Sequence, residues 1–245
     1  FKSKFPYINS NNYFLGVFVS ITAVQRPELL TDRHAFKLRC LSFAFVGLAV
    51  MLYVLISIGG LVRNAGAGLS CPDWPLCFGQ LVPSQLSQVQ VFLEWFHRLI
   101  AGTSGFILLG ASAFIFKDRA LRKVLGARTA FAIALLVAQV VLGGLTVIGL
   151  LSPKWVTSHL AIGLAFFITV LTIGLRLRDL NRSPKSSSIS RWAIGLGVAF
   201  YVQAILGGLV SSHYAGLACP DFPMCNGQWL PALQDGVEFQ FIHRL

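Results

Sequence analysis

The sequence predicts an all-α integral membrane protein that is built as a tandem parallel repeat of a four-helix bundle. Composition is the first reason: of the 245 residues, 55% are hydrophobic, only 12% are charged, and the mean hydropathy is +0.70. Such a chain has too few polar side chains to cover a water-facing surface. The other two reasons are a series of long apolar runs and a cysteine-containing segment that occurs twice. A soluble globular domain is therefore excluded.

Five apolar runs are long enough to cross about 30 Å of hydrocarbon as helices. They cover residues 41–62, 89–116, 129–150, 155–175 and 192–211. A shorter run at 14–24 is too brief to cross and lacks the small-residue cleavage site of a secretory signal, so we interpret it as tail or interfacial helix. The lipid bilayer is thus the first predicted partner. The net charge of +11 does not by itself indicate nucleic acid, and we expect no nucleic-acid partner.

Basic residues predict the orientation of these spans, because Lys and Arg in short loops remain on the cytoplasmic side of the membrane. They are concentrated before the first span and in the loops after the second and fourth spans, whereas the alternate loops carry only Arg63 and Lys154. The loop expected between the second and third spans carries Lys117, Arg119, Arg122, Lys123 and Arg128. We therefore expect residues 1–40 to form a cytoplasmic tail and both cysteine loops to lie on the outer face of a bacterial plasma membrane.

Four of the five cysteines lie in the two loops expected outside: Cys71 and Cys77 in CPDWPLC, and Cys219 and Cys225 in CPDFPMC. In an oxidising compartment the natural interpretation is two short-loop disulfides, and the prolines restrict the backbone so that paired α-carbons could approach to about 5.5 Å. A single zinc site that pools four thiolates is the weaker alternative. Redox-active cysteine pairs are a third. Cys40, at the inner end of the first span, is expected to be a buried thiol without a special role.

The chain repeats itself in the same orientation. The segments GGLV and GLSCPDWPLCFGQ align without a gap with GGLV and GLACPDFPMCNGQ, and HRL at 97–99 meets HRL at 243–245 after a two-residue deletion. An even number of spans per unit permits such a parallel repeat. We expect a four-helix unit at 41–178, a cytoplasmic linker at 179–190 and an incomplete second unit at 191–245. These are five spans and the start of a sixth, from a protein of about eight helices.

A finer repeat links three histidines. Each of three outward-going helices ends in Gly-Gly-Leu, and each returning helix has a histidine near its start: His97, His159 and His243. One intramembrane histidine taken alone is more often a hydrogen-bonding partner between helices than a metal ligand. Their common depth favours heme, because a heme held edge-on between helices needs an imidazole on each side of its iron. We expect His97 and His159 to face each other, and His243 to ligate a second heme iron.

The residues beside the histidines differ between the two copies. Glu94, three positions before His97, aligns with Gln240. This spacing puts the carboxylate on the same helix face as the histidine, where it is costly unless it has a partner or a function. Arg98 is the salt-bridge alternative, and we favour a catalytic function for Glu94. Arg98 and Arg244 are expected either to bind heme propionates or to extend toward the membrane surface.

These motifs resemble one family. GGLVRNAGAGLSCPDWPLCFGQLVP followed by EWFHRL is similar to the first half of bacterial heme A synthases of the cysteine-containing type, and CPDFPMC with FIHRL is similar to their second half. The similarity covers about residues 41–245. Members of that family are eight-helix membrane oxidoreductases. They oxidise a methyl substituent of heme O, through a hydroxylated intermediate, to the formyl group of heme A for terminal oxidases.

The resemblance also implies roles for single residues. His97 and His159 would ligate the iron of the substrate heme O, Glu94 would assist catalysis, and His243 would help to bind a heme b cofactor. A heme O synthase and an unidentified electron donor are the implied partners, and a homo-oligomer is compatible with the sequence. A reaction in the first unit and cofactor binding in the second agree with the difference between Glu94 and Gln240, because a glutamate can exchange a proton whereas a glutamine can only form hydrogen bonds.

Two other classes of protein stay open on the residues alone. A diheme b-type electron-transfer protein linked to quinone would use the same histidines but would have no evident need for Glu94. A transporter built from parallel repeats would explain the duplication but not the common depth of the histidines.

Overall fold

The computed structural model describes residues 32–180 and 191–245. In these ranges the chain is helical, and its β structure is limited to two isolated bridges. The helices are α2 (Asp32–Asn64), α3 (Val89–Lys117), α4 (Arg119–Ile148), α5 (Pro153–Leu180), α6 (Arg191–Ser212), the short 3-10 helix η1 (Ala215–Leu217) and α7 (Val237–Arg244). The predicted interfacial segment at 14–24 and most of the predicted linker at 179–190 lie outside the described residues.

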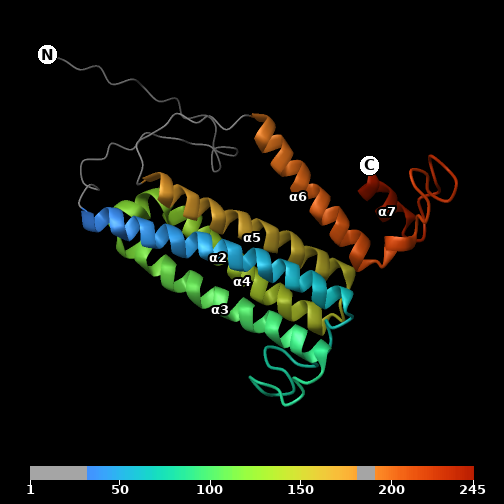
Figure 1. Ribbon diagram of the computed structural model, residues 1–245, viewed down its shortest axis with the longest axis horizontal. Coiled ribbons are helices and arrows are strands. Elements are labelled where there is room, and N and C mark those ends of the chain that lie inside the picture. Colours follow the sequence, from blue (N-terminus) through green and yellow to red (C-terminus); the bar gives the residue numbers. More distant parts are fainter. Residues whose placement is uncertain (1–31, 181–190) are drawn as a thin grey trace.

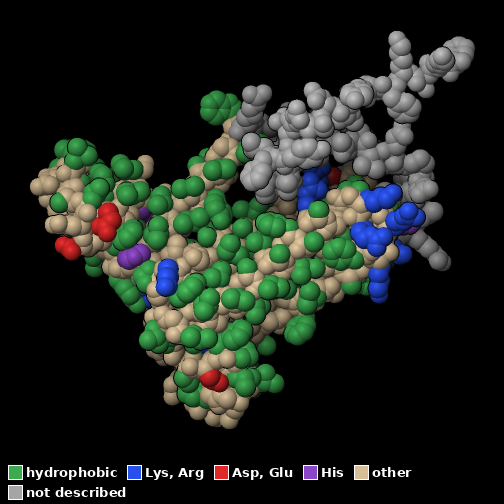
Figure 2. All heavy atoms as spheres, turned by 180° about the vertical axis from the view of Figure 1, so that it is seen from behind, with side chains coloured by type: hydrophobic (Ala, Val, Ile, Leu, Met, Phe, Trp, Pro, Cys, Tyr) green, Lys and Arg blue, Asp and Glu red, His purple; other side chains and the backbone are tan. Residues whose placement is uncertain are grey.

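Helices α2 to α6 are each long and apolar enough to cross a membrane, which confirms the five predicted spans. Figure 2 shows apolar side chains over the flanks of the molecule, while most of the visible Lys and Arg side chains gather at one end. This distribution suits a bilayer, because apolar flanks meet hydrocarbon and basic residues stay at headgroup depth. The chain is therefore an all-α, multi-pass membrane protein.

Four of the helices, α2 to α5, form a bundle in which consecutive helices are neighbours (Figure 1). α5 also packs against α2, so the four helices close into a ring. α3 and α5 are therefore diagonal to each other, with α2 and α4 between them. Both diagonal helices run in the same direction, so their starts lie at the same end of the bundle.

The apolar core fills the half of the bundle that contains the turn between α3 and α4. Its largest fully buried side chains come from all four helices and are Phe45, Leu108, Ile115, Leu125, Ile173 and Leu177. The other half, next to the first cysteine loop, is packed differently. There α3 has no buried residue between Glu94 and Ser104, and α5 has none before Phe166. Burial of apolar surface therefore holds one half of the bundle closed, and the half next to the loop is less densely filled.

α2 and α5 approach closely in the packed half. The carbonyl of Gly174 accepts a 2.9 Å hydrogen bond from the hydroxyl of Ser42, and a methyl group placed on Gly174 would stand 3.0 Å from the backbone nitrogen of Val46. Small residues permit this separation between membrane helices, where packing and hydrogen bonds drive association. The bundle is thus fixed at the end opposite to the cysteine loop.

The turn between α3 and α4 is shorter than the loop expected from the sequence. Asp118 alone separates the helices, and its side chain caps α4 by accepting hydrogen bonds from the backbone N–H groups of Ala120 and Leu121. The basic residues from Arg119 to Arg128 therefore lie on the first turns of α4, and the prediction that they form a loop was wrong. α2 likewise begins at Asp32, inside the segment expected to be a tail.

Cys40 is exposed, so the prediction of a buried thiol was wrong. The buried positions of α2 form a stripe at helical spacing, from Leu38 through Ser42 and Phe45 to Leu52. Cys40 is two residues past Leu38, which puts it on about the opposite face of the helix. The apolar run predicts a membrane span but does not show which face of it meets the bundle.

α6 leaves the bundle at an angle and packs along α5, while the carbonyl of Ser211 at its end accepts a hydrogen bond from Arg63 of α2 (Figure 1). The hydroxyl of Tyr201 donates to the carbonyl of Ala161 at 3.0 Å, and the hydroxyls of Thr157 and Ser212 lie 3.1 Å apart. Hydrogen bonds between polar groups are effective links between helices in a bilayer. They hold the first helix after the linker against the last helix of the bundle.

Arg63 joins the end of α2 to the last turn of α6 and to Tyr214, which follows α6. Its guanidinium donates to the hydroxyl of Tyr214 at 2.6 Å and to the carbonyl of Ser211 at 2.9 Å. It also stacks on the Tyr214 ring, with its central carbon 4.0 Å from the ring centroid. The sequence shows Arg63 only as one of two basic residues in the outward loops, whereas the structure shows a contact between the two repeats.

Candidate functional site

Both predicted disulfides are formed. The S–S distances are 2.02 Å in Cys71–Cys77 and 1.98 Å in Cys219–Cys225, and the α-carbons of each pair are 4.7 Å apart. The alternative of one zinc site is contradicted, because the four thiols are paired. The described residues also contain no group of three His, Cys, Asp or Glu side chains placed to hold a metal ion.

An aspartate organises each cysteine loop from within. The carboxylate of Asp73 accepts hydrogen bonds from the backbone N–H groups of Gly79 at 2.8 Å and Phe78 at 2.6 Å. These bonds, that of Gly79 first, hold the pKa of Asp73 below its ordinary value of 3.8, and equivalent bonds lower the pKa of Asp221 in the second loop. Both loops therefore share one internal geometry around a charged carboxylate.

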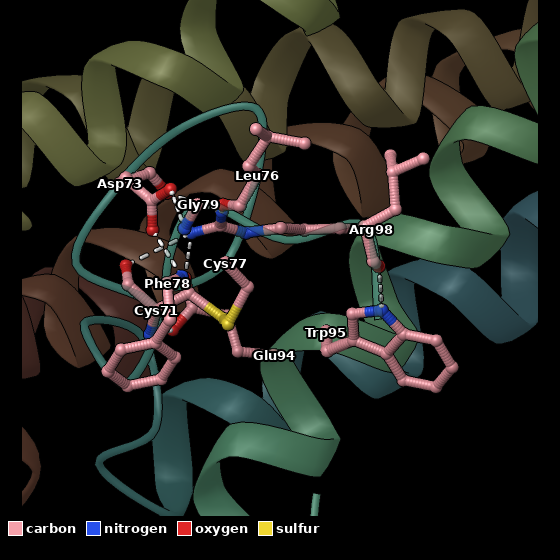
Figure 3. The surroundings of a disulfide bond; sticks show 10 residues. Cys71, Asp73, Leu76, Cys77, Phe78, Gly79, Glu94, Trp95 and Arg98 are labelled. Atoms are coloured by element: carbon pink, nitrogen blue, oxygen red, sulfur yellow. Dashed lines mark hydrogen bonds and ion pairs between the residues drawn. A yellow bond between two sulfur atoms is a disulfide. The ribbon is translucent and has the colours of Figure 1, made fainter. Parts of the chain in front are cut away.

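Glu94 and Arg98 connect the first cysteine loop to α3 (Figure 3). Glu94 is buried, with 4% of its surface exposed; one of its oxygens accepts a 2.8 Å hydrogen bond from the backbone N–H of Cys71, and the other forms an ion pair with Arg98. The Arg98 guanidinium also donates to the carbonyls of Asp73 and Leu76, each at 2.6 Å. The salt bridge that the sequence offered as the alternative role of Glu94 is thus present, and it anchors the loop.

The second cysteine loop repeats this arrangement with one chemical change. Arg244 donates to carbonyls of its loop as Arg98 does, including a 2.6 Å bond to Asp221. Gln240, which aligns with Glu94, donates from its amide to the carbonyl of Gly216 in η1, just before the loop, at 3.2 Å. A carboxylate acceptor in the first unit is therefore replaced by an amide donor in the second. The binding of heme propionates by either arginine stays a prediction.

Each predicted histidine lies against the first glycine of a Gly-Gly pair. The distances from a methyl group placed on the glycine to Cε1 of the imidazole are 3.1 Å for Gly59 and His97, 3.5 Å for Gly143 and His159, and 3.2 Å for Gly207 and His243. The Nδ1 atom of each of these imidazoles is buried and has no hydrogen-bond partner among the described residues. For His159 and His243 this disfavours the alternative that the rings join helices by hydrogen bonds, because such a role would satisfy this nitrogen. The ring of His97 lies near the backbone carbonyl of Leu55 on α2.

His97 and His159 lie on the diagonal helices, near the starts of α3 and α5, in the less densely filled half of the bundle. The ring of His97 packs against Gly59 of α2, and the ring of His159 packs against Gly143 of α4. Two imidazoles from diagonal helices, glycines in place of side chains behind them, and little buried core between them fit a heme held edge-on.

Trp74 extends from the first cysteine loop to α4. A methyl group placed on Gly144 would stand 3.2 Å from the indole of Trp74, while the neighbouring Gly143 faces His159. The loop thus reaches α4 at the end of the bundle at which the histidines lie. The aromatic residue inside CPDWPLC is the one sequence signal for this contact, and a phenylalanine stands at its place in the second loop.

Two glutamines that the sequence analysis did not select also contact the histidines. The amide of Gln139 donates to the backbone carbonyl of His159 at 3.0 Å, and that of Gln203 donates to the carbonyl of His243 at 2.7 Å. Each glutamine stands four residues before a Gly-Gly pair, in QVVLGGL and QAILGGL. That shared motif is the signal that could have found them. The first pair is preceded by Leu55, in LISIGGL.

The fold and the site define a class of protein: a multi-pass helical membrane protein with two disulfide-closed loops and a histidine against the first glycine of each of three Gly-Gly pairs. A comparison with protein families makes the assignment more specific. The model of the cytochrome oxidase assembly protein family COX15-CtaA matches residues 42–245, a range that holds both cysteine loops and all three histidines. The chain belongs to this family.

Curated relatives of the chain carry the name heme A synthase. The protein of Shewanella oneidensis is 34% identical over 203 residues, which is 75% of this chain and 61% of the relative. That of Bacillus licheniformis is 32% identical over 190 residues, 74% of this chain and 62% of the relative. That of Geobacillus kaustophilus is 32% identical over 212 residues, 83% of this chain and 66% of the relative. The chain thus spans about three fifths to two thirds of the length of these relatives.

Proposed function

We propose that the protein is a heme A synthase, an oxidoreductase that converts the methyl substituent of heme O to the formyl group of heme A. Overall the methyl group and one water give the formyl group, four protons and four electrons, through an alcohol and a geminal diol that loses water, and the electrons pass to the redox partner proposed below. The pair of histidines on diagonal helices carries this proposal, because it is the one feature that specifically suits a heme. The name shared by the relatives and the membership of an oxidase assembly family support it.

The substrate heme O is bound in the first unit, with His97 and His159 on the two faces of its iron. Support comes from the less densely filled half of the bundle around both imidazoles and from the glycines behind them. Trp74 of the disulfide-closed loop contacts Gly144, next to the glycine that faces His159, and on binding of the substrate the loop would limit the access of water to this end. Such exclusion strengthens electrostatic interactions at the reacting substituent.

Glu94 serves this reaction by holding the loop over the site and by taking a proton or stabilising positive charge that develops on the substrate. It is three residues before His97, so both project from the same face of α3. Its contact with the backbone N–H of Cys71 supports the loop-holding role. Gln240 at the matching position supports the proton-related role, since the second unit has no need to react.

The second unit binds heme b through His243, and bound heme b would supply one-electron transfer beside the substrate. Gln203 donates to the carbonyl of His243, and the next residue, Arg244, ties α7 to the loop closed by Cys219–Cys225. A heme O synthase supplies the substrate, and a redox partner of unidentified nature exchanges electrons with the cofactor. The cytoplasmic N-terminus and the outer position of both cysteine loops are part of the proposal. The two disulfides support them, because disulfides form outside the cytoplasm.

Heme extraction tests this function directly. The full-length protein is co-expressed with a heme O synthase in a host that lacks heme A, and the extracted hemes are identified by liquid chromatography with mass spectrometry. Heme A or its hydroxylated precursor is the expected product. A heme-loaded protein that yields only heme b and unreacted heme O would overturn the proposal in favour of a diheme electron-transfer protein. A protein without visible heme absorbance would favour the transporter class.

Glu94→Gln is the matched variant for the catalytic step, because Gln240 shows that a glutamine fits the equivalent place. We expect this variant to keep its heme and its disulfide while heme A output falls by at least about tenfold, within the range of a lost general acid or base. The measurement is heme A per purified protein, with Gln240→Glu as the control in the second unit. Normal heme A output from Glu94→Gln would remove Glu94 from the mechanism.

A further inference from the structure

The glutamine contacts have a common geometry. Gln139 and Gly143 are one helical turn apart on α4, and both face His159: the amide binds its backbone carbonyl at 3.0 Å and the glycine receives its ring. Gln203 and Gly207 do the same for His243 on α7. The glutamine therefore fixes the backbone of the histidine and the glycine fixes the position of the ring. Together they determine how deep the imidazole lies along the neighbouring helix.

The backbone carbonyl of His159 has room for the amide of Gln139 as a second hydrogen-bond donor. A helix carbonyl already accepts from the N–H four residues later, and for His159 that residue is Gly163. A methyl group placed on Gly163 would stand 3.6 Å from the carboxamide oxygen of Gln139, an ordinary van der Waals contact. The amide thus lies beside the helix backbone, where it adds a second hydrogen bond to a carbonyl with a spare lone pair.

The hairpin of α2 and α3 has no glutamine that could donate to the carbonyl of its histidine. Leu55 occupies the place of the glutamine, and its side chain has no donor for the carbonyl of His97. The imidazole of His97 nevertheless packs against Gly59. The α3 helix is instead fixed through the cysteine loop, by Glu94 and Arg98. The two histidines of the first unit are therefore held in different ways, one by the adjacent helix and one by the loop.

We propose that Gln139 and Gln203 are positioning residues that set the depth of His159 and His243 for heme ligation. The first unit then has one histidine fixed by a glutamine, His159, and one that lacks such a contact, His97. This inference rests on the proposed function, since it assigns these histidines to heme iron. It adds residues that lie outside the cysteine and histidine motifs and that touch the ligands only through the backbone.

Three variants of the purified, heme-loaded full-length protein test the proposal. Gln139→Met keeps the length of the side chain and removes the donor, Gln203→Met does the same in the other unit, and Leu55→Gln adds the missing donor beside His97. The readouts are the low-spin heme signals in electron paramagnetic resonance and the rate of heme transfer to apomyoglobin. Thermal unfolding is recorded in parallel.

We expect Gln139→Met to shift one low-spin signal and to speed the loss of that heme about three- to fivefold, the factor that one net hydrogen bond gives. Gln203→Met is expected to change only the other heme, and Leu55→Gln is expected to slow heme loss from the first unit by a similar factor.

Two results would overturn the proposal. One is an unchanged signal and an unchanged rate of heme loss in Gln139→Met; the other is an equal change of both hemes in each methionine variant, which indicates general loosening. If Gln139→Met does not fold, Leu55→Gln decides by the same readouts. Wild-type protein without any low-spin heme would overturn the proposed function as well, whereas heme A synthesis with an unaffected Gln139→Met would overturn this inference alone.

Discussion

At the scale of single residues, the space behind each imidazole depends on the absence of a side chain. A methyl group on Gly59 would stand 3.1 Å from Cε1 of His97, whereas one on Gly60 meets no described atom within 4 Å. We therefore expect Gly59→Ala to displace the imidazole of His97 and to cost about 1 kcal/mol, the lower end of overpacking effects. The measurement is the heme content and the low-spin signal of the purified variant. Gly60→Ala is the control, and equal behaviour of the two variants would contradict the contact.

The aspartate inside each cysteine loop gives a second prediction. The backbone N–H groups of Gly79 and Phe78 lower the pKa of Asp73, so its carboxylate stabilises the folded loop at pH values above 3.8, and this contribution is lost as the pH falls through the lowered pKa. Protection of these two amides in hydrogen exchange is expected to be constant from pH 7 to about 5 and to fall only in acid below the ordinary pKa of the group.

The control for this prediction is Asp73→Asn. The variant keeps one acceptor oxygen and loses the titrating group, so protection should be lower at neutral pH and should no longer depend on acid. A loss of protection in the wild-type loop already near pH 6 would show that another group controls the loop.

The contacts of Glu94 illustrate what the sequence can and cannot predict for a single residue. Its place three residues before His97 and its pairing with Arg98 follow from helical spacing. Its bond to the backbone N–H of Cys71 does not, because it depends on how the loop folds back over the start of α3. The same limit applies to Arg98, whose loop carbonyls are defined only once the disulfide closes the turn.

At the scale of helices, the crossing of α2 and α5 fixes the packed half of the bundle. A methyl group on Gly174 would stand 2.9 Å from Cγ2 and 3.0 Å from the backbone nitrogen of Val46, and backbone cannot move aside cheaply. We expect Gly174→Ala to destabilise the protein by about 1–3 kcal/mol, as overpacking does. Gly47→Ala on α2 is the control, because its methyl meets no described atom within 4 Å. Thermal unfolding in detergent measures both, and an unchanged midpoint for Gly174→Ala would contradict the close crossing.

The sequence predicts well that the five spanning helices are present, and it predicts less well the residues at which they begin and end. The five apolar runs correspond to α2–α6, because a membrane span needs about 20 apolar residues and this signal is strong. The start of α4 could not be placed from the apolar run, since the helix begins ten residues earlier at a cap made by Asp118. The run also left open which face of α2 meets the bundle, and Cys40 proved to be on the outer side.

At the scale of the whole molecule, Arg63 is the outer link between the bundle and the hairpin of α6 and α7. Its hydrogen bonds to Tyr214 and Ser211 join segments that are about 150 residues apart in the chain. We expect Arg63→Gln to weaken this link by about 1 kcal/mol, as the loss of a charge-assisted bond at a partly exposed site does. Hydrogen exchange of the segment around η1 should rise several-fold, since that segment then opens more often.

The matched control is Lys154→Gln, which removes the same charge from the same face, where the ammonium only approaches the ring of Trp155 at 5.0 Å. Exchange around η1 should be unchanged in this variant. If both variants loosened the segment equally, the effect would be one of net charge, and the specific bonds of Arg63 would not explain it.

The arrangement of the site as a whole could be predicted in part. The disulfides and the pairing of each histidine with a Gly-Gly pair follow from repeated motifs, because a repeat exposes positions that share one environment. The glutamines and Trp74 could not be selected in this way, because their contacts run between helices or between a loop and a helix that are not adjacent in sequence. Such contacts depend on the register of neighbouring helices, which a periodic apolar pattern does not define.

One measurement tests the central claim, that a single heme is held between His97 and His159. Electron paramagnetic resonance of the oxidised full-length protein is recorded for His97→Ala, His159→Ala and, as a control, His213→Ala, which removes an exposed histidine. We predict that the first two variants lose the same low-spin signal, because both imidazoles bind one iron, and that the control retains it. Loss of two different signals, or retention of every signal in either variant, would contradict the account.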